Sequence, residues 1–420
     1  MHTAKESPTE TSWIGPSLDD FIAAQTAVAS VVRPTPLQSS RFLAEHVGVP
    51  IGLKCENLQR TGSYKIRGAY NRLFKLDAGQ RARGVVAASA GNHAQGVALA
   101  ARELGIHATI FMPVGVALPK YQATRAYGAD VVLVGSTFEE TLESALTFTS
   151  STGAEFIPPF DHPDIVAGQG TLGLEILRDA PDVRTVVVPV GGGGLISGVA
   201  SALKQRAQRE GREIRVFGVQ AENAAAYPVS LAAGQVLDIP QATTIADGIA
   251  VRRPGNLNFE MVQRYVDDVV TVSEDDIARA LLVLLERAKL VVEPAGAVSV
   301  AALLAGALPV EGHTVAILSG GNIDPLLMQR VISHGLAASD RYLTLSIMLP
   351  DRPGQLSRIA DVLASVNANV VEVLHTRHGR GLQISEVELE VSVETRDAQQ
   401  QDEVIAALRT AGYSPTVIDD

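Results

Sequence analysis

The chain has 420 residues, of which 46% are hydrophobic and 19% are charged, a balance typical of a globular protein with a large core rather than a disordered chain. At this length two or three domains are expected. The formal net charge of −11, with no basic cluster to offset it locally, argues against nucleic acid as the main partner.

The compartment follows from the cysteine count and the N-terminus. Cys55 is the only cysteine, so the chain can form neither an intrachain disulfide nor a thiolate metal cluster, which suits a reducing compartment. Glu6 and Glu10 lie where a secretory signal would need an apolar run. No stretch approaches the ~18 uninterrupted apolar residues of a membrane span. We therefore expect a soluble cytoplasmic protein with no membrane partner.

An alternation of predicted strands and helices covers most of the chain. Residues 1–16 form a polar tail, and residues 17–335 alternate short Val/Ile-rich runs with stretches of helical periodicity. Strands are predicted at 84–89, 108–113, 130–135, 185–190 and 215–220, and helices at 91–105, 119–129, 137–149, 194–207 and 223–234. Apolar runs between amphipathic helices indicate strands buried on both faces. The predicted fold class is α/β with open, mostly parallel sheets, and ligands are expected beyond the carboxyl ends of the strands.

The pattern changes near residue 340. Residues 341–350 alternate as a half-exposed strand would, and a helical stretch, two further strands, a helix at 397–411 and a short strand at 413–418 follow. The order βαββαβ in about 80 residues is the ferredoxin-like arrangement. We predict a second domain at 341–420, with the boundary between Gly335 and Tyr342.

Two of the loops that follow predicted strands favour anions. "SAGNHAQG" (89–96) lies between a strand and a helix, where backbone N–H groups favour an anion; the alternative is an ordinary turn capped by Ser89 or Asn92. "PVGGGGLISG" (189–198) contains four consecutive glycines, which are costly in entropy and suit a backbone wrapped around phosphate. It fits neither G-x-G-x-x-G nor the P-loop pattern, and the alternative is a merely tight turn.

The third loop and one lysine complete the predicted site. In "AILSGGNID" (316–324), Ser319 could hold a heteroatom of a ligand ring, although a plain turn is equally compatible. "TGSYKIRGAY" (61–70) places Lys65 among small and hydroxyl residues, where a surface lysine would have charged neighbours. A phosphate cup, an anion-binding helix start and such a lysine fit pyridoxal 5'-phosphate, whose aldehyde a lysine holds as a Schiff base. Burial and the charge of Arg67 are expected to lower the pKa of that lysine.

These motifs resemble one family closely. "SYKIRGA", "SAGNHAQG", "GGGGLISG", "IADG" with "RRPGN", "EPAGA" and "SGGNID" occur in family order over roughly residues 18–335, and the chain resembles the pyridoxal-phosphate threonine dehydratases (threonine ammonia-lyases) of fold type II, with a C-terminal ACT domain. The resemblance implies a two-lobed catalytic core. It implies that Lys65 is the catalytic lysine and that the cofactor is bound by Lys65, Asn92, Gly191, Gly192, Gly193, Gly194, Leu195 and Ser319. It implies that the substrate carboxylate is bound by Ser89, Ala90, Gly91, Asn92 and His93.

The resemblance also implies details of the chemistry. Asn92 should hydrogen-bond the 3-hydroxyl of the cofactor and Ser319 should face its pyridine nitrogen. His93 follows Asn92 at a helix start, so packing and loop shape are expected of it rather than base chemistry. Asp247 and Glu293 lie in family motifs, but isolated acidic residues are usually surface groups, and no role is assigned to them.

The implied activity is deamination of L-threonine to 2-oxobutanoate and ammonia, with L-serine as a poorer substrate. The related serine racemases carry a serine acid/base where this chain has Ala90, so a dehydratase is favoured over a racemase. The segment "QAENAAAYP" (220–228) lacks the paired carboxylates that bind a divalent ion in the racemases, and no metal is expected. Three alternatives stay open: an amino-acid-sensing protein with a degenerate catalytic core, a serine racemase/dehydratase, and a sulfhydrylase or synthase of the same fold.

The resemblance also suggests regulation and assembly. An ACT domain pairs with another copy and binds an amino-acid effector at the joint, for which isoleucine or valine is the first choice; a dimerisation module without a ligand is the alternative. In "DRPGQL" (351–356), Asp351 is expected to cap the helix, Pro353 to occupy its first turn and Gly354 to let the backbone approach a ligand. The candidate regulatory residues are Asp351, Arg352, Gly354, Asn367 and Asn369. A homotetramer is expected.

Overall fold

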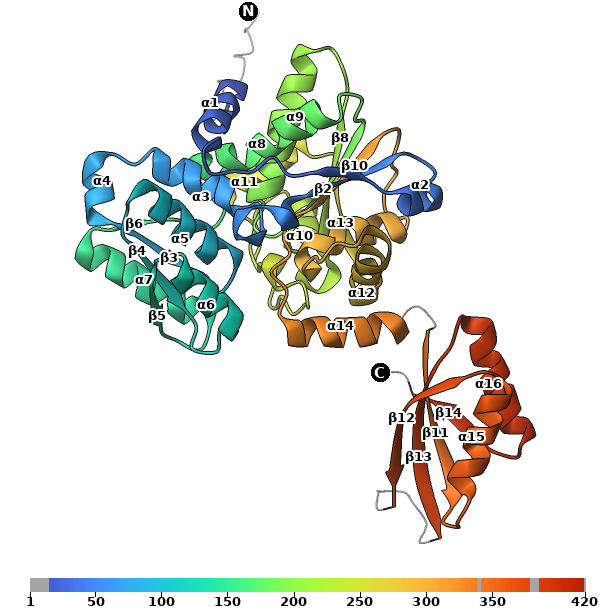
Figure 1. Cartoon of the computed structure of the whole chain (residues 1–420). Helices are drawn as coiled ribbons and strands as arrows, with labels where there is room; N and C mark the ends of the chain where they lie inside the picture. Colours follow the sequence, from blue (N-terminus) through green and yellow to red (C-terminus); the bar gives the residue numbers. More distant parts are fainter. Residues whose placement is uncertain (1–14, 338–340, 378–384, 419–420) are drawn as a thin grey trace, which may run out of the picture. The chain divides into compact units, whose positions relative to one another are not determined.

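The computed structural model describes residues 15–337, 341–377 and 385–418. Contacts divide the chain into two compact units (Figure 1). The first comprises residues up to Ile277 together with Arg287–Asp324, and the second comprises Ala278–Glu286 together with the chain from Pro325 onward. Helix α14 (Pro325–Ala337) is thus grouped with the second unit, and the boundary after Gly335 stays a prediction.

The larger sheet of the first unit has six strands in the order β1-β2-β10-β7-β8-β9. Its strands are β1 (Leu37–Ser39), β2 (Ile51–Cys55), β7 (Thr185–Pro189), β8 (Arg215–Ala221), β9 (Asp268–Val272) and β10 (Thr314–Leu318). Every pairing is parallel except that of β1 with β2. The predicted open, mostly parallel sheet is confirmed.

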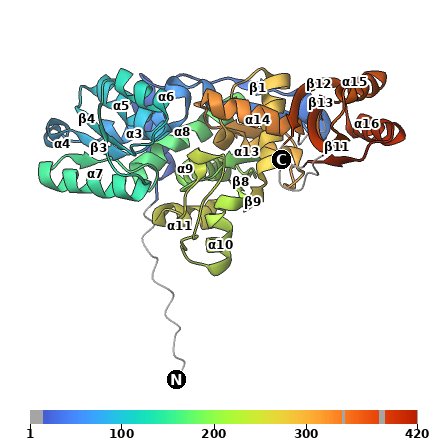
Figure 2. The same ribbon diagram turned by 90° about the horizontal axis from the view of Figure 1, so that it is seen from below.

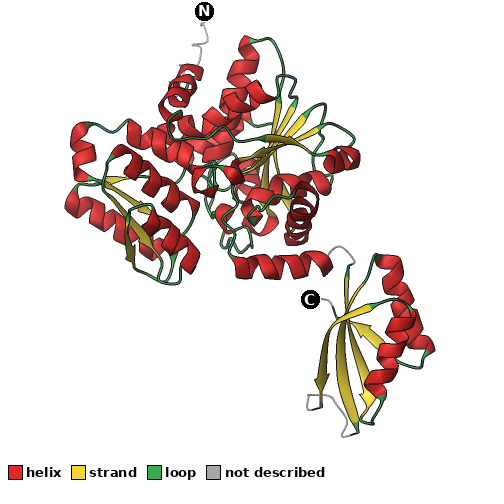
Figure 3. Cartoon of the chain, in the orientation of Figure 1, coloured by secondary structure: helices red, strands yellow, loops and turns green. Residues whose placement is uncertain are grey.

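The smaller sheet has the order β5-β4-β3-β6 and is parallel throughout. Its strands are β3 (Val85–Ala88), β4 (Ala108–Met112), β5 (Asp130–Leu133) and β6 (Glu155–Phe156). Val85 and Ala87 pack in one apolar cluster with residues of helix α5 (Asn92–Leu104), whereas Val86 and Ala88 pack with Ala145 of helix α7 (Phe138–Thr152). Helices on opposite faces therefore bury both sides of this sheet, as Figure 3 shows.

Helices surround both sheets of the first unit. They are α1 (Leu18–Val28), α2 (Arg41–Val47), α3 (Lys65–Phe74), α4 (Ala78–Arg83), α5 (Asn92–Leu104), α6 (Leu118–Ala126), α7 (Phe138–Thr152), α8 (Pro163–Asp179), α9 (Gly194–Arg209), α10 (Ala226–Ala233), α11 (Asn256–Tyr265) and α13 (Pro294–Leu304), while α12 (Glu274–Val283) runs from the first unit into the second. In Figure 1, α9 and α13 lie on opposite faces of the six-stranded sheet. Among the described residues no helix is long and apolar enough to cross a membrane.

Helix α8 joins the two lobes of the first unit, and in Figure 2 it lies between the two sheets. It packs on both α3 and α9, and glycines set the spacing. A Cβ added at Gly168 would lie 2.5 Å from the Arg67 carbonyl oxygen, and one added at Gly198 would lie 2.5 Å from the Val166 carbonyl oxygen. Backbones can approach this closely only where no side chain intervenes. The start of α3 and the start of α9 are therefore held to one common helix.

The second unit contains an antiparallel sheet in the order β12-β13-β11-β14. Its strands and helices run β11 (Tyr342–Pro350), α15 (Gln355–Ser365), β12 (Asn369–Thr376), β13 (Glu386–Glu394), α16 (Ala398–Thr410) and β14 (Pro415–Val417). Ile359 and Leu363 of α15 and Val404 and Leu408 of α16 pack on the inward side chains of β11 and β13. The predicted βαββαβ ferredoxin-like order is confirmed.

Candidate active site

Lys65 is the first residue of α3, and the backbone before it is fastened to the loop after β10. Tyr64 N donates to the Ser319 carbonyl at 3.1 Å, and Gly321 N donates to the Gly62 carbonyl at 2.9 Å. These bonds join segments about 255 residues apart in sequence. The lysine and the predicted ring-facing serine therefore lie in one place.

A short strap, residues 157–161, connects the lysine to two other loops. Lys65 Nζ donates to the Pro159 carbonyl at 3.1 Å, and His93 Nε2 lies 2.9 Å from the Ile157 carbonyl. Burial, with the nearby Lys65 charge, lowers the pKa of His93 to about 3, so its ring is neutral. Because a carbonyl can only accept, Nε2 carries the proton. His93 thus fastens the 89–93 loop to the strap, in keeping with the packing role expected for it.

The tetraglycine turn opens α9, and it has no room for side chains. Gly193 is the N-cap of α9 with φ 101°, and the cap makes no side-chain hydrogen bond. A Cβ at Gly193 would lie 1.9 Å from the Tyr227 hydroxyl, and one at Gly192 would lie 2.4 Å from the Phe160 ring. Tyr227 Oη also donates to the Gly192 carbonyl at 3.2 Å. The turn is therefore held in shape from both sides while its N–H groups stay uncapped.

This donor set fits the phosphate of pyridoxal phosphate. The first N–H groups of a helix have no partner within the helix and carry the positive end of its dipole. A further polar atom near Lys65 lacks a partner: Ser63 Oγ is buried without a hydrogen bond among the described residues. The family resemblance implies that the residues that would hold the cofactor are Lys65, Gly191, Gly192, Gly193, Gly194, Leu195, Ser319 and Asn92, and this assignment stays a prediction.

The loop at 89–93 leads from β3 into α5 and is only partly buried as far as Asn92. Gly91 is the N-cap of α5 and makes no side-chain cap; its N–H donates to Ser89 Oγ at 3.1 Å. Neither Ser89 nor Asn92 caps the helix, so the alternative of an ordinary capped turn is wrong. Uncapped N–H groups at this helix start suit a substrate carboxylate.

Asn92 is held by two side chains. Its Nδ2 donates to Glu293 Oε1 at 2.6 Å, and its Oδ1 accepts from Asn322 Nδ2 at 2.8 Å. The expectation that Glu293 is a surface group is wrong, since the residue is only 4% exposed. Asp247 fits that expectation: its side chain is 53% exposed and forms an ion pair with Lys120.

The guanidinium of Arg67 is not available as a positive charge beside Lys65, contrary to the expectation from the sequence. Its guanidinium lies in the core and forms ion pairs with Glu56 and Glu175, each at 2.7 Å. Lys54 is also fully buried and lies 3.1 Å from Glu175. Residues two positions apart in a helix do not face the same side, so α3 presents Lys65 to the site and Arg67 to α8. The arginine charge is neutralised there.

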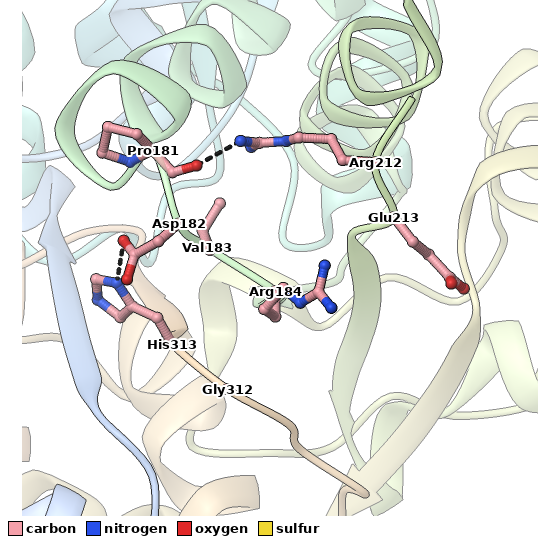
Figure 4. Close-up of a pocket in the computed structure, with 8 residues that line it drawn as sticks. All are labelled: Pro181, Asp182, Val183, Arg184, Arg212, Glu213, Gly312 and His313. Carbon is pink, nitrogen blue, oxygen red and sulfur yellow. Dashed lines mark hydrogen bonds and ion pairs between the residues drawn. The ribbon is translucent and has the colours of Figure 1, made fainter. Parts of the chain in front are cut away.

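The site lies where parallel strands end. Lys65 apart, the predicted residues follow the carboxyl ends of β3, β7 and β10, the position expected for a ligand in such sheets. A surface hollow of about 420 Å³ lies at the opposite, amino ends of β7, β8 and β10, lined by Pro181, Asp182, Val183, Arg184, Arg212, Glu213, Gly312 and His313 (Figure 4). Asp182 is paired there with His313 at 2.9 Å. No predicted site residue reaches this hollow.

Sequence reasoning missed four groups: the strap, Tyr227, Asn322 and the buried Glu293. A double proline directly after a strand, in "FIPPFD", was the signal for the strap, because it fixes an extended connection. Glu293 and Asn322 lie in the motifs "EPAGA" and "SGGNID", but no local signal reveals the partners of these two residues or of Tyr227. Among the described residues there is no group of three or more His, Cys, Asp or Glu side chains that could hold a metal ion, and the expectation that no metal binds stays a prediction.

In the second unit, two expectations about "DRPGQL" are wrong. The N-cap of α15 is Gly354, with φ 88° and no side-chain cap. Asp351 instead forms an ion pair with Arg377 at 3.4 Å, and Pro353 precedes the helix rather than lying in its first turn. Asn367 adopts φ 53° in the turn, and Asn369 is the first residue of β12.

Comparisons with known proteins agree with this geometry. Residues 28–320 match the family model of pyridoxal-phosphate-dependent enzymes, and residues 343–412 match the ACT domain. The L-threonine ammonia-lyase of Thermotoga maritima is 48% identical over 403 residues, covering 96% of this chain and 99% of the relative. The structure of processed threonine deaminase isoform 2 from Solanum lycopersicum matches with TM-score 0.72 and 37% identity, covering 79% of this chain and 98% of that one.

The structure of maize serine racemase matches equally well in shape, with TM-score 0.72 and 35% identity over 77% of this chain and 98% of that one. Its likeness extends over the catalytic core rather than the full chain, whereas the match to the Thermotoga relative includes the C-terminal domain. The chain therefore belongs to the threonine ammonia-lyase family of pyridoxal-phosphate-dependent enzymes, with an ACT domain at its C-terminus.

Proposed function

We propose that this chain deaminates L-threonine to 2-oxobutanoate and ammonia, with deamination of L-serine to pyruvate as a side activity. The observation that carries the proposal is the meeting of Lys65, the uncapped start of α9 and Ser319 at the carboxyl ends of the strands. When bound, the cofactor supplies an electron sink that weakens the substrate Cα–H bond.

The chain supplies the rest of the chemistry. Lys65 Nζ holds the cofactor aldehyde and, once released by the substrate, accepts the proton from the substrate Cα. The N–H groups at 89–93 bind the substrate carboxylate and set the orientation of Cα. Ser319 offers a hydroxyl rather than a carboxylate to the pyridine nitrogen, which leaves that nitrogen largely unprotonated and favours elimination over racemisation.

The test is ammonia release from a panel of L- and D-amino acids. We expect L-threonine to be preferred over L-serine by about tenfold or less in kcat/KM, because one methyl group in an apolar pocket is worth ~1–3 kcal/mol. Lys65→Ala should abolish turnover. Lys75→Ala is the matched control, since Lys75 follows the same helix and pairs with Asp164 at the surface. An unchanged rate in Lys65→Ala, or no ammonia from the unaltered enzyme, would favour the sensing protein with a degenerate core.

The second candidate, a racemase with dehydratase activity, rests on the likeness to the maize serine racemase. Ala90 gives the opposite face of Cα no hydroxyl that could deliver a proton. Ala90→Ser should therefore add measurable exchange of the serine Cα proton with deuterated solvent. Complete absence of exchange in that variant would show that Ala90 does not decide between the two activities.

We further propose that the ACT domain pairs with a second copy and binds an amino acid at the joint, with isoleucine or valine as the first choice. Strand β12 supports pairing: it is the edge of its sheet, and Val371 and Leu374 are 46% and 49% exposed. An unpaired edge with apolar side chains is a template for another chain. Gly354 leaves the start of α15 uncapped for a carboxylate, whereas Asn367 and Asn369 follow the other end of that helix.

Two measurements on the full chain test regulation and assembly. Isothermal titration with isoleucine, valine and threonine should give heat for an effector that also changes threonine kinetics. Linkage then requires threonine to weaken effector binding by the factor by which the effector weakens threonine binding. No heat with unchanged kinetics would leave a purely structural role. We also propose that the protein is a cytoplasmic homotetramer. Light scattering should then give a mass about four times that of the 44.3 kDa chain, and a mass near that of one chain would contradict assembly.

A further inference from the structure

Glu293 is a buried carboxyl beside the predicted cofactor site. It is the N-cap of α13, yet its side chain does not cap that helix. Its backbone N donates to the Gly320 carbonyl at 3.0 Å, which places it against the loop that carries Ser319. Glu293 is only 4% exposed, and burial of an ionisable side chain costs free energy unless a hydrogen-bond partner compensates. That partner is Asn92.

The partner belongs to a row of hydrogen bonds whose direction can be read from one end. Asn322 Nδ2 donates to the Thr61 carbonyl at 2.6 Å and to Asn92 Oδ1 at 2.8 Å. Because a backbone carbonyl only accepts, the nitrogen of Asn322 must face it, and both N–H groups of that amide are then used. Asn92 must therefore present its oxygen to Asn322 and its nitrogen to Glu293. Glu293 Oε1 is the final acceptor.

Among the hydrogen bonds of the described residues, this row leaves one N–H of the Asn92 amide without a partner. An asparagine amide has two N–H groups, and Glu293 takes only one of those on Asn92. The other N–H lies in the plane of an amide that Asn322 and Glu293 hold from both sides. A fixed donor is what recognition of the cofactor's 3-oxygen requires, because a side chain that must first be ordered loses part of its binding free energy.

We propose that Glu293 is a positioning residue, which holds the Asn92 amide in the one orientation that offers an N–H to the 3-oxygen of pyridoxal phosphate. The inference rests on the proposed role of Asn92 and deepens it, by assigning to Glu293 a task that the sequence motifs leave unassigned. Glu293 acts through Asn92 and touches neither substrate nor cofactor.

Gly320 provides the space for this arrangement. A Cβ added there would lie 2.2 Å from Glu293 Oε1 and 3.1 Å from Asn92 Nδ2. Since atoms do not approach to 2.2 Å without displacement, any side chain at position 320 would push the carboxyl away from Asn92. The first glycine of "SGGN" is thereby explained by the carboxyl rather than by a turn.

The charge state of Glu293 leaves the contact intact. Burial, with a smaller contribution from the Asp247 carboxylate, raises the pKa of Glu293 to about 7, against the opposing effects of the Asn92 hydrogen bond, the Lys120 ammonium and the backbone N–H of Asn322. A proton on Oε2 still lets Oε1 accept from Asn92. The bond strengthens when Glu293 ionises, because hydrogen bonds to charged groups are the stronger ones. The electron density at the 3-oxygen should therefore change as Glu293 titrates.

The experiment uses the full holoenzyme and two substitutions at one position. Glu293→Gln keeps an acceptor oxygen and removes the ionisation, whereas Glu293→Ala removes the acceptor. We expect Glu293→Gln to bind pyridoxal phosphate within about threefold of the unaltered protein, and Glu293→Ala to bind it on the order of tenfold more weakly. Cofactor affinity is measured by equilibrium dialysis of the resolved enzyme, independently of turnover.

A spectroscopic titration supplies the second readout. The visible absorption of the bound cofactor should show a transition near pH 7 in the unaltered protein, and Glu293→Gln should lack it. Asp247→Asn is the charge control: it makes no contact with Asn92 among those described, and loss of its negative charge should move the transition to lower pH. In an Asn92→Ala background Glu293→Ala should have no further effect on affinity, because its action passes through Asn92.

Two results would overturn the proposal: unchanged cofactor affinity in folded Glu293→Ala, or an equal loss from Glu293→Ala with and without Asn92. If Glu293→Ala does not fold, Glu293→Gln decides, since an unchanged transition near pH 7 in that variant refutes the assignment. The proposed activity is judged separately. A protein that binds the cofactor through Lys65 and shows this pattern, but releases no ammonia from threonine, would refute the deamination and leave Glu293's role standing.

Discussion

The substitution Arg67→Met removes the centre of a buried charge cluster beneath the site. The Arg67 guanidinium makes five hydrogen bonds, two to Glu56 at 2.7 and 2.9 Å, two to Glu175 at 2.7 and 3.0 Å, and one to Thr171 at 3.1 Å. Its side chain and that of Glu56 are completely buried, and that of Glu175 is 8% exposed. Methionine fills a similar volume, so the main loss is electrostatic.

The magnitude follows from the partners that are left behind. Glu175 keeps Lys54 at 3.1 Å, but Glu56 keeps only the hydroxyl of Thr35, at 2.6 Å, as a hydrogen-bond donor. Breaking a buried ion pair by removing one member costs about 3–5 kcal/mol, because the other charge stays buried without compensation. We expect a loss of that size in the unfolding free energy of the first unit. Because Arg67 lies two residues after Lys65 in α3, cofactor affinity should fall as well.

The sign of the pH dependence provides an internal check. Burial raises the pKa of Glu56, but the charge and hydrogen bonds of Arg67 lower it below its ordinary value. In the unaltered protein Glu56 therefore stabilises the fold above its unfolded pKa, and this stability is lost as the pH falls through the folded value. Without Arg67 burial dominates, the folded pKa lies above the unfolded one, and stability should instead fall as the pH rises.

The assay is urea unfolding followed by circular dichroism and by cofactor absorbance, at pH 5 and pH 8. Adding Glu56→Gln to Arg67→Met should recover part of the loss, since it removes the stranded charge. The control is Lys75→Met on the same helix, whose partly exposed ion pair with Asp164 is worth about 1 kcal/mol or less. An unfolding free energy for Arg67→Met within 1 kcal/mol of the unaltered value at both pH values would refute the reasoning.

Three further outcomes are expected. Gly193→Ala should weaken cofactor binding at least tenfold in equilibrium dialysis, since φ 101° and the nearby Tyr227 hydroxyl exclude a Cβ; wild-type affinity would contradict the phosphate assignment. Glu293→Gln should match the unfolding free energy of the unaltered protein near pH 4.5 and exceed it by up to about 3 kcal/mol at pH 8.5. The reason is that the unaltered protein loses stability between the unfolded pKa of Glu293 and its folded value of about 7, whereas glutamine does not titrate. A difference in urea unfolding that does not change with pH would contradict this. Leu374→Lys should reduce the mass found by light scattering, because it charges the exposed β12 edge; an unchanged mass would place the pairing elsewhere.

The sequence predicts best what is local. The strands and helices that Val/Ile runs and helical periodicity predict between residues 84 and 234 agree with the structure to within a few residues, whereas β6 and α8 in the same range are not predicted. The glycine turn was predictable because four consecutive glycines are costly without a ligand or a close approach, and Tyr227 and Phe160 supply that close approach on the protein side. The neighbours of Lys65 indicate a site only together with the anion-binding loops and the family motifs, and its role as the cofactor lysine stays a proposal.

Contacts over long sequence distances were not predictable from the same patterns. Glu293 was assigned to the surface because no local pattern distinguishes a buried acid from a solvated one, and its partner Asn92 lies about 200 residues away. The closeness of Arg67 and Lys65 in sequence predicts that Arg67 acts on the lysine. Its guanidinium instead binds the carboxylates of Glu56, directly after β2, and of Glu175 in α8. Asp351 was expected to cap α15, but Gly354 occupies the N-cap.

The same helix crossing links the stability of the first unit to the binding of its cofactor. Lys65 opens α3 and the tetraglycine turn opens α9, and α8 touches both helices through glycines that allow backbone contact. The cluster around Arg67 fastens α3 to α8 on the face away from the site. A cofactor bound to both Lys65 and the start of α9 would hold α3 and α9 together on the side of the site, and it would bind only the folded state. Its binding therefore adds RT ln(1 + [L]/Kd) to stability, and the burial of two cations, Arg67 and Lys54, with two carboxylates, Glu56 and Glu175, beneath the site serves the geometry of the lysine as much as the fold.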